Sequence, residues 1–131
     1  MIANAGISND ASPIETATVD SVQEHINVNA IGPYLLFQAT FGLLKKAKQP
    51  KFVVIGSALG SIGYMEQRAA HGLFAYGASK AMAHWTSRRI HFSHENIISF
   101  VVDPVSYSPY FYLAISIKEQ GEWFADYRSL C

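Results

Sequence analysis

The chain has 131 residues, of which half are hydrophobic and 15% are charged. This length and composition are typical of one compact domain or part of one, and they exclude a disordered or multidomain chain. Ten Lys and Arg residues balance ten Asp and Glu residues, so the net charge is zero. Because no broad basic surface is available, nucleic acid and anionic membranes are not expected as partners.

The cysteine content and the first residues favour a reducing, cytoplasmic setting. The single cysteine, Cys131, cannot form an internal disulfide and has no histidine or cysteine at zinc-ligand spacing. The residues after Met1 lack the basic and apolar regions of a secretory signal. The uncharged run 25–44 contains polar residues such as Asn27 and Asn29, so it predicts a helix buried in protein and no membrane span.

The first predicted elements are a short strand end and a long helix. Residues 2–3 have the character of the last residues of a strand, followed by a turn. A helix is expected over 18–47, because Thr18 is a good N-cap and apolar residues recur at helical spacing on two faces. Two apolar faces indicate that one packs on a sheet and the other needs separate cover, such as a partner subunit.

The rest of the pattern alternates strands and helices. Residues 51–55 form a short apolar run rich in β-branched residues, which is typical of a strand buried on both faces. A glycine-containing loop follows, then a predicted helix over 74–94 and a second buried strand over 97–102. This alternation predicts an α/β fold with a parallel sheet.

A phenol, an ammonium and a hydroxyl form the candidate chemical site. Tyr76 and Lys80 lie four residues apart on the helix predicted over 74–94, so they share one face. An ammonium near a phenol favours the phenolate, which makes the pair a candidate general acid and base. Ser57 follows a strand, where parallel sheets bind ligands, and its hydroxyl could hydrogen-bond a substrate carbonyl. Taken alone, the pair could also be a surface tyrosine beside a surface lysine.

Two other interpretations of the polar residues are weaker. His84, His91 and His94 recur at helical spacing, but no carboxylate or cysteine pattern accompanies them, so a polar helix face is expected and no metal site. Ser57 is not predicted to be a hydrolase nucleophile, because Ile55 occupies the position of the first glycine in a Gly-x-Ser-x-Gly elbow.

Four segments together resemble the motifs of the short-chain dehydrogenases/reductases. In chain order they are Asn4-Ala5-Gly6, Val28-Asn29-Ala30, Gly56-Ser57-Ala58-Leu59-Gly60 and Tyr76-Gly77-Ala78-Ser79-Lys80. The resemblance covers residues 2–103, and the residues around Asn29 and Tyr76 are similar to those of fungal ketoreductases of the norsolorinic acid ketoreductase type. It implies a partial Rossmann-like, doubly wound parallel sheet, the second half of an α/β domain without its first three β-α units.

The resemblance also implies a role for each matching residue. Tyr76 would be the proton donor in carbonyl reduction, and Ser57 would orient and polarise the carbonyl. Lys80 would support Tyr76 and hold the nicotinamide ribose of NADP or NAD, and Asn4 and Tyr76 would also contact this cofactor. Asn29 would offer its backbone carbonyl to a water molecule in a proton relay.

Elementary chemistry supports the implied role of the Asn29 carbonyl. Pro33, four residues further on, has no N–H, so this carbonyl loses its usual helical partner. The same feature is expected of a simple proline kink without a catalytic role.

The sequence departs from the family pattern at both ends. The glycine-rich turn that binds a dinucleotide pyrophosphate is absent from the sequence, and three β-α units of roughly 30 residues each would have to precede residue 2. Val105 replaces the glycine expected after Pro104, and the remaining residues are rich in aromatic side chains. We therefore expect a partial short-chain dehydrogenase domain over 1–104 and a divergent aromatic-rich tail over 105–131.

Two functions follow as hypotheses from different classes. The first is an NAD(P)-dependent oxidoreductase that interconverts a ketone and an alcohol on a small-molecule substrate. The second is a non-catalytic fragment or pseudoenzyme that acts as an interaction partner. The helices over 18–47 and 74–94 would mediate that interaction, and they could also form a homodimer. The substrate, the hydride direction and the choice of NAD or NADP stay open.

Overall fold

The computed structural model describes residues 1–68, 72–104, 117–119 and 122–124. A parallel three-stranded sheet is formed, in spatial order, by β1 (Ile2–Ala3), β2 (Lys51–Ile55) and β3 (Ile98–Val102). The register places Val53 between Ile2 and Phe100. The predicted strands and the parallel α/β fold class are therefore confirmed, with β3 beginning one residue later than expected. The expectation that both strands are buried on both faces is wrong, because burial alternates along β2 and Ile98 of β3 is 38% exposed.

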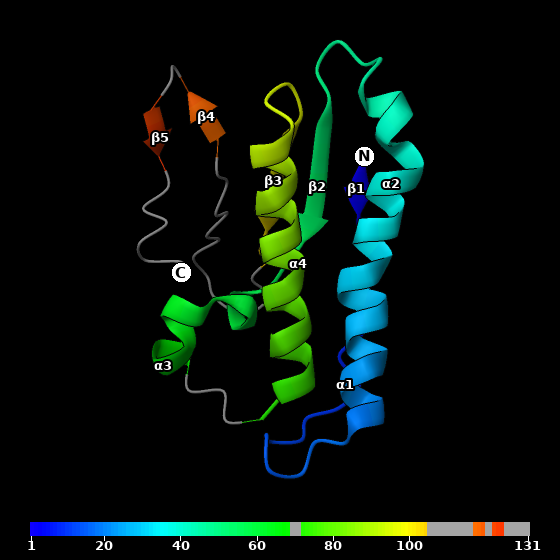
Figure 1. Cartoon of the computed structure of the whole chain (residues 1–131). Helices are drawn as coiled ribbons and strands as arrows, with labels where there is room; N and C mark the ends of the chain where they lie inside the picture. Colours follow the sequence, from blue (N-terminus) through cyan, green and yellow to red (C-terminus); the bar gives the residue numbers. More distant parts are fainter. Residues whose placement is uncertain (69–71, 105–116, 120–121, 125–131) are drawn as a thin grey trace.

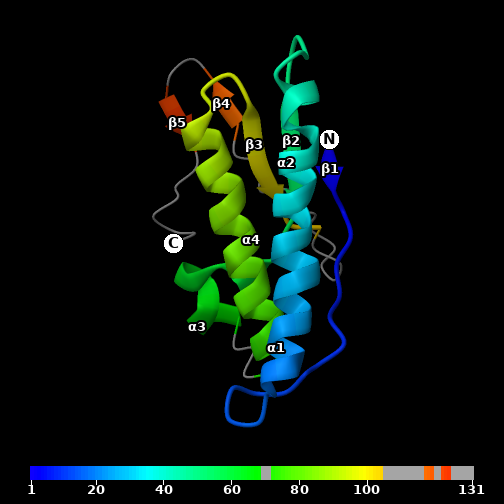
Figure 2. The same ribbon diagram turned by 45° about the vertical axis from the view of Figure 1, so that its right-hand side comes forward.

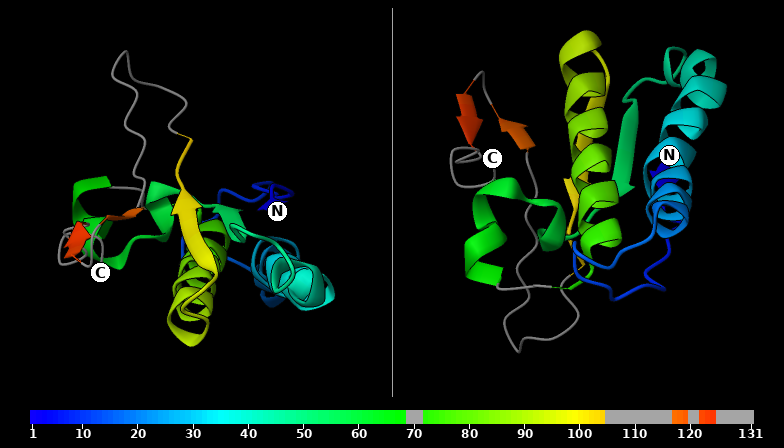
Figure 3. Two further views of the ribbon diagram at one scale, coloured as in Figure 1. Left: turned by 90° about the horizontal axis from the view of Figure 1, so that it is seen from above. Right: turned by 60° about the horizontal axis from the view of Figure 1, so that its bottom comes forward.

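The helical layer lies on one face of this sheet (Figure 3). Its two main members are a rod made of α1 (Val19–Ile26), η1 (Asn27–Ile31) and α2 (Gly32–Leu44), and α4 (Phe74–Ser93). The rod and α4 run side by side in front of the strands (Figures 1 and 2). Three shorter elements, η2 (Ala58–Gly60), η3 (Ile62–Tyr64) and α3 (Met65–Arg68), connect β2 to α4.

The rod formed by α1, η1 and α2 corresponds to the helix predicted over 18–47, with two differences. Thr18 is its N-cap as expected, because its Oγ1 accepts from the Ser21 N–H at 3.2 Å. The rod is not uniformly α-helical: η1 is a π-helical turn in which the Gly32 N–H donates to the carbonyl of Asn27. Pro33 has no N–H to continue the α-helical ladder, which explains the wider turn just before it. The helix also ends at Leu44, earlier than residue 47.

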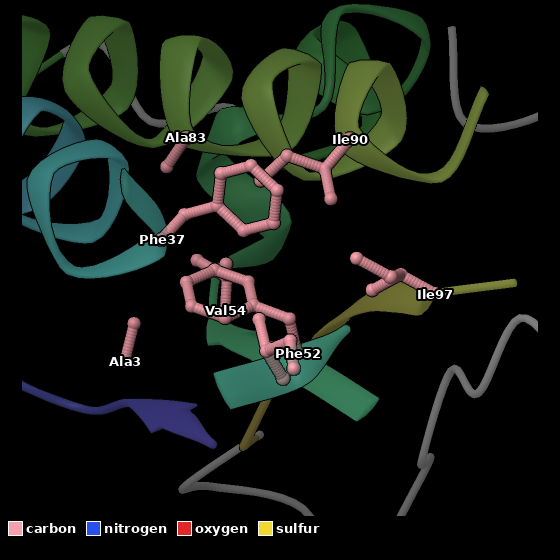
Figure 4. Close-up of a cluster of buried hydrophobic side chains, with 8 residues drawn as sticks. Ala3, Phe37, Phe52, Val54, Ala83, Ile90 and Ile97 are labelled. Carbon is pink, nitrogen blue, oxygen red and sulfur yellow. The ribbon is translucent and has the colours of Figure 1, made fainter. Parts of the chain in front are cut away.

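An apolar core joins both the α1–η1–α2 rod and α4 to the sheet. Its buried residues are Ala3, Phe37, Leu44, Phe52, Val54, Ala83, Ile90 and Ile97 (Figure 4). Phe37 of α2 meets Phe52 of β2 edge to face, with ring centroids 5.3 Å apart. A buried hydrogen bond of 3.0 Å between Ser87 and Ser99 adds a polar link from α4 to β3. The helices are thus held rigidly over the strands, and this rigidity positions the site described below.

The C-terminal part contributes one small antiparallel pair, β4 (Ile117–Glu119) and β5 (Glu122–Phe124). Most of the tail predicted over 105–131 lies outside the described residues, so the domain boundary stays a prediction. No helix among the described residues is long and apolar enough to cross a membrane.

Candidate active site

The predicted site residues lie on α4, on the elements that contact it and just after the strands: Asn29 is on η1, Ser57 precedes η2, and η1 and η2 both contact α4 (Figure 1). Residues 4–7 follow β1, and Ser57 follows β2. Tyr76 and Lys80 lie in the first half of α4. This end of a parallel sheet is where α/β folds bind ligands, as the sequence predicted.

Lys80 is the buried cation of the site. Its side chain is only 4% exposed, and its Nζ donates to the backbone carbonyl of Ile55 at 2.8 Å. The same Nζ lies 5.6 Å from the centroid of the Tyr76 ring. Burial lowers the pKa of Lys80, and the carboxylate of Asp103, just after β3, partly opposes this shift. The predicted pairing of phenol and ammonium on one helix face is therefore present, with the ammonium fixed to the end of β2.

The Ser57 loop is clamped onto the same helix. Ser57 caps η2 through its Oγ, which accepts from the Leu59 N–H at 3.2 Å. A Cβ on Gly60 would lie 2.7 Å from the backbone carbon of Lys80. Such a distance is far inside van der Waals contact, so only glycine lets the loop approach α4 this closely. A Cβ on Gly77 would likewise lie 3.1 Å from the Leu59 carbonyl oxygen.

Asn29 links two of the motifs through its side chain. This side chain is 1% exposed, and its Oδ1 accepts from the Ile7 N–H at 2.8 Å. Its Nδ2 donates to the Ile7 carbonyl and to Ser79 Oγ, both at 2.9 Å. Ser79 Oγ in turn donates to the Tyr76 carbonyl at 2.7 Å. The chain after β1 is thus tied to the backbone of the tyrosine motif through one amide.

This side-chain role was not foreseen, because the sequence pointed only to the backbone carbonyl of Asn29. Ser79 was missed as well. Its signal was available: Ser79, Ala83 and Ser87 recur every four residues, and all three are buried on α4. A serine on an apolar helix face needs a hydrogen-bond partner, which Asn29 supplies.

Of the predicted cofactor-binding residues, Tyr76 and Lys80 lie close together on α4, with Lys80 Nζ 5.6 Å from the centroid of the Tyr76 ring. Asn4 is exposed immediately after β1. Two residues later, a Cβ on Gly6 would lie 3.5 Å from Lys80 Nζ and 3.1 Å from Asn29 Oδ1. The Asn-Ala-Gly turn therefore approaches the buried ammonium through Gly6, and cofactor binding by Asn4 stays a prediction.

The three histidines of α4 and its end each have a partner within the fold. The Ser57 N–H donates to His84 Nε2 at 3.2 Å. His91 Nδ1 lies 3.3 Å from the Ile97 carbonyl, and the ring of His94 packs 4.8 Å from that of Phe41. The expectation of a plain polar face is therefore wrong for His84 and His94, since one joins the Ser57 loop and the other joins an aromatic cluster.

His84 should make folding stability depend on pH. Burial and the Lys80 ammonium lower its pKa from 6.5 to about 4. Between these two values the unfolded chain binds more protons, so the free energy of unfolding should fall as the pH drops through this window. A difference of this size corresponds to roughly 3 kcal/mol at most. Urea unfolding across the window should show a steeper loss for the native chain than for His84→Gln, and equal slopes would contradict the prediction.

A family model described as short chain dehydrogenase matches residues 1–102. The chain belongs to this family, as its motifs indicated.

Among its relatives is the norsolorinic acid ketoreductase nor1 of Dothistroma septosporum, 41% identical over 106 residues. Another is the norsolorinic acid ketoreductase stcE of Emericella nidulans, 38% identical over 104 residues. Each alignment covers 79% of this chain and 40% of the relative. The chain thus spans about 40% of the length of these curated relatives.

A solved structure with the same fold is the NADPH-bound carbonyl reductase from chicken fatty liver. It is 29% identical, with a TM-score of 0.72, over 79% of this chain and 44% of that chain. The partial Rossmann-like architecture is therefore established, whereas the roles of the individual site residues stay predictions.

Proposed function

We propose that this chain carries the proton-transfer site of an NAD(P)-dependent oxidoreductase that reduces a small-molecule ketone to an alcohol. The observation that carries the proposal is the buried Lys80 ammonium, which lies 5.6 Å from the centroid of the Tyr76 ring and donates to the Ile55 carbonyl, two residues before Ser57. Burying a cation is costly unless the protein binds it, so its place beside a phenol supports a chemical role.

We assign a role to each group from its chemistry. Tyr76 donates its hydroxyl proton to the carbonyl oxygen as the alcohol forms, and Ser57 holds that oxygen through its hydroxyl. The hydride that such a reduction requires would come from a nicotinamide cofactor when it is bound. Lys80 and Asn4 are the residues that would hold this cofactor. The Asn29 carbonyl, which has no N–H partner at Pro33, accepts a hydrogen bond from a water molecule that returns a proton to the site.

The relatives guide the choice of substrate and cofactor. Two are named norsolorinic acid ketoreductases, and a structural neighbour is an NADPH-bound carbonyl reductase. Norsolorinic acid is therefore the first ketone to test, with NADPH before NADH. A cytoplasmic location and a domain boundary after Pro104 belong to the same proposal.

The test is a chimera in which residues 1–102 replace the matching segment of the Dothistroma septosporum relative. We expect NADPH oxidation that depends on an added ketone. The parent relative serves as the positive control, and cofactor-induced thermal stabilisation shows that the chimera is folded and binds NADPH. A chimera that binds NADPH without reducing any ketone that the parent reduces would overturn the proposal.

A non-catalytic interaction partner is the second candidate, and exposed apolar side chains favour it. Leu35 and Leu43 on α2 and Trp85 on α4 are each more than half exposed. Exposed apolar side chains on both α2 and α4 support a homodimer or a docked partner. An unchanged melting temperature of the 131-residue chain at millimolar NADPH, together with a dimer in sedimentation, would favour this function.

A further inference from the structure

The stretch around Gly56 is held from both sides by side chains of α4. Lys80 Nζ binds the carbonyl of Ile55, and His84 Nε2 accepts from the N–H of Ser57 at 3.2 Å. Tyr76, Lys80 and His84 follow one another at four-residue spacing, so they lie along one face of the helix. The same face therefore carries the candidate acid, its cation and an acceptor for the Ser57 amide.

The packing at Gly56 constrains the backbone that carries the Ser57 amide toward His84. A Cβ on Gly56 would lie 2.2 Å from Val101 Cγ1 and 2.4 Å from His84 Nε2. No side chain can occupy that position, so the backbone is confined between β3 and the imidazole. This confinement brings the Ser57 amide to the ring nitrogen.

The imidazole is an acceptor over the neutral pH range. Accepting at Nε2 requires the neutral tautomer that carries its proton on Nδ1. Burial, and next the positive charge of Lys80, lower the pKa of His84 to about 4. Protonation would replace the acceptor by a second cation close to Lys80, and so it would break the contact with Ser57.

We infer that His84 is a positioning residue that holds the Ser57 amide and thereby fixes the direction of the Ser57 hydroxyl. The Oγ accepts from the Leu59 N–H, which leaves the hydroxyl proton to point at a substrate oxygen. Without the His84 contact the loop can turn about Gly56, and the hydroxyl loses its direction. This inference rests on the proposed role of Ser57 in carbonyl reduction.

Two variants in the chimera separate the hydrogen bond from simple packing. His84→Leu fills the space without an acceptor, so kcat for the ketone should fall by roughly 10- to 100-fold, because small displacements at a reacting centre are costly. His84→Gln places a carbonyl oxygen in reach of the amide, so it should retain most of kcat. The KM for NADPH should stay within about two-fold in both. Arg89→Ala, an exposed change on the same helix, is the control.

The outcomes are distinct. Rescue by Gln and loss with Leu supports the inference, whereas equal kcat in both variants, whether unchanged or reduced, overturns it. Nitrogen NMR of the 131-residue chain gives a second readout. It should show the Nδ1–H tautomer at His84 and an upfield move of the Ser57 amide proton in His84→Leu; an unmoved amide overturns the contact itself.

The same set of measurements keeps the two ideas apart. If Tyr76→Phe retains full activity while the Ser57 amide responds to His84, the proposed function fails and the contact stands. If Tyr76→Phe is inactive while His84→Leu keeps the kcat of the parent chimera, only the positioning role fails.

Discussion

Replacing Tyr76 by phenylalanine in the chimera should lower the rate of ketone reduction by roughly 10²- to 10⁴-fold, the usual contribution of a positioned general acid. The change removes one oxygen atom and leaves the ring beside the Lys80 ammonium. The backbone anchor of the motif is also untouched, because Ser79 binds the carbonyl of Tyr76 and not its hydroxyl. Cofactor binding and folding should therefore be preserved while proton transfer is lost.

The measurement is steady-state NADPH oxidation together with the NADPH-induced rise in melting temperature. Tyr34→Phe is the matched control, since the Tyr34 hydroxyl accepts from the Gln38 amide on an exposed part of α2 and lies outside the candidate site. We expect parent activity in Tyr34→Phe. Retained turnover in Tyr76→Phe would show that another group supplies the proton.

Replacing Asn29 by alanine should destabilise the fold by roughly 3 to 5 kcal/mol, a loss typical of breaking a buried polar network. The side chain is 1% exposed and makes three hydrogen bonds, two to the Ile7 backbone and one to Ser79. Removing it leaves these partners without their acceptor or donor and opens a small cavity between the chain after β1 and α4.

Urea unfolding of the 131-residue chain provides the test. Asn27→Ala is the control, because Asn27 lies one half-turn earlier on the same rod, is exposed, and its side-chain Oδ1 accepts from the exposed Gln23 side chain. Its effect should stay within about 0.5 kcal/mol. Ser79→Ala should fall between the two, since it removes one bond of the network. Equal effects of Asn29→Ala and Asn27→Ala would contradict the structural role of the buried amide.

Local patterns were sufficient for the secondary structure and the sheet direction. The apolar run 51–55 and the similar run 97–102 became neighbouring parallel strands, as their β-branched composition indicated. Their expected burial on both faces was wrong, because the helices cover only one face of this sheet. Thr18 began the first helix as its side chain chemistry predicted. Pro33 indicated a local defect, but its form as a π-helical turn depended on how the neighbouring backbone groups found partners.

In the candidate site, too, some features could be predicted from the sequence and others required the tertiary structure. Tyr76 and Lys80 could be paired from sequence because helical spacing alone sets their common face. His84 continues that spacing, yet its acceptor role needed the end of β2 to arrive beside it. The links from Asn29 to Ile7 and Ser79 likewise span distant parts of the chain.

By itself the sequence determined the alternation of strands and helices, the family motifs and the residue types available for proton transfer. Each of these features depends only on residues that are close together in the chain. Only the tertiary structure decided which backbone groups those side chains bind. Lys80 meets Ile55, His84 meets Ser57 and Asn29 meets Ile7 because the core packs α4 and the first rod over the sheet. Such pairings depend on close approach between distant segments, which local periodicity does not encode.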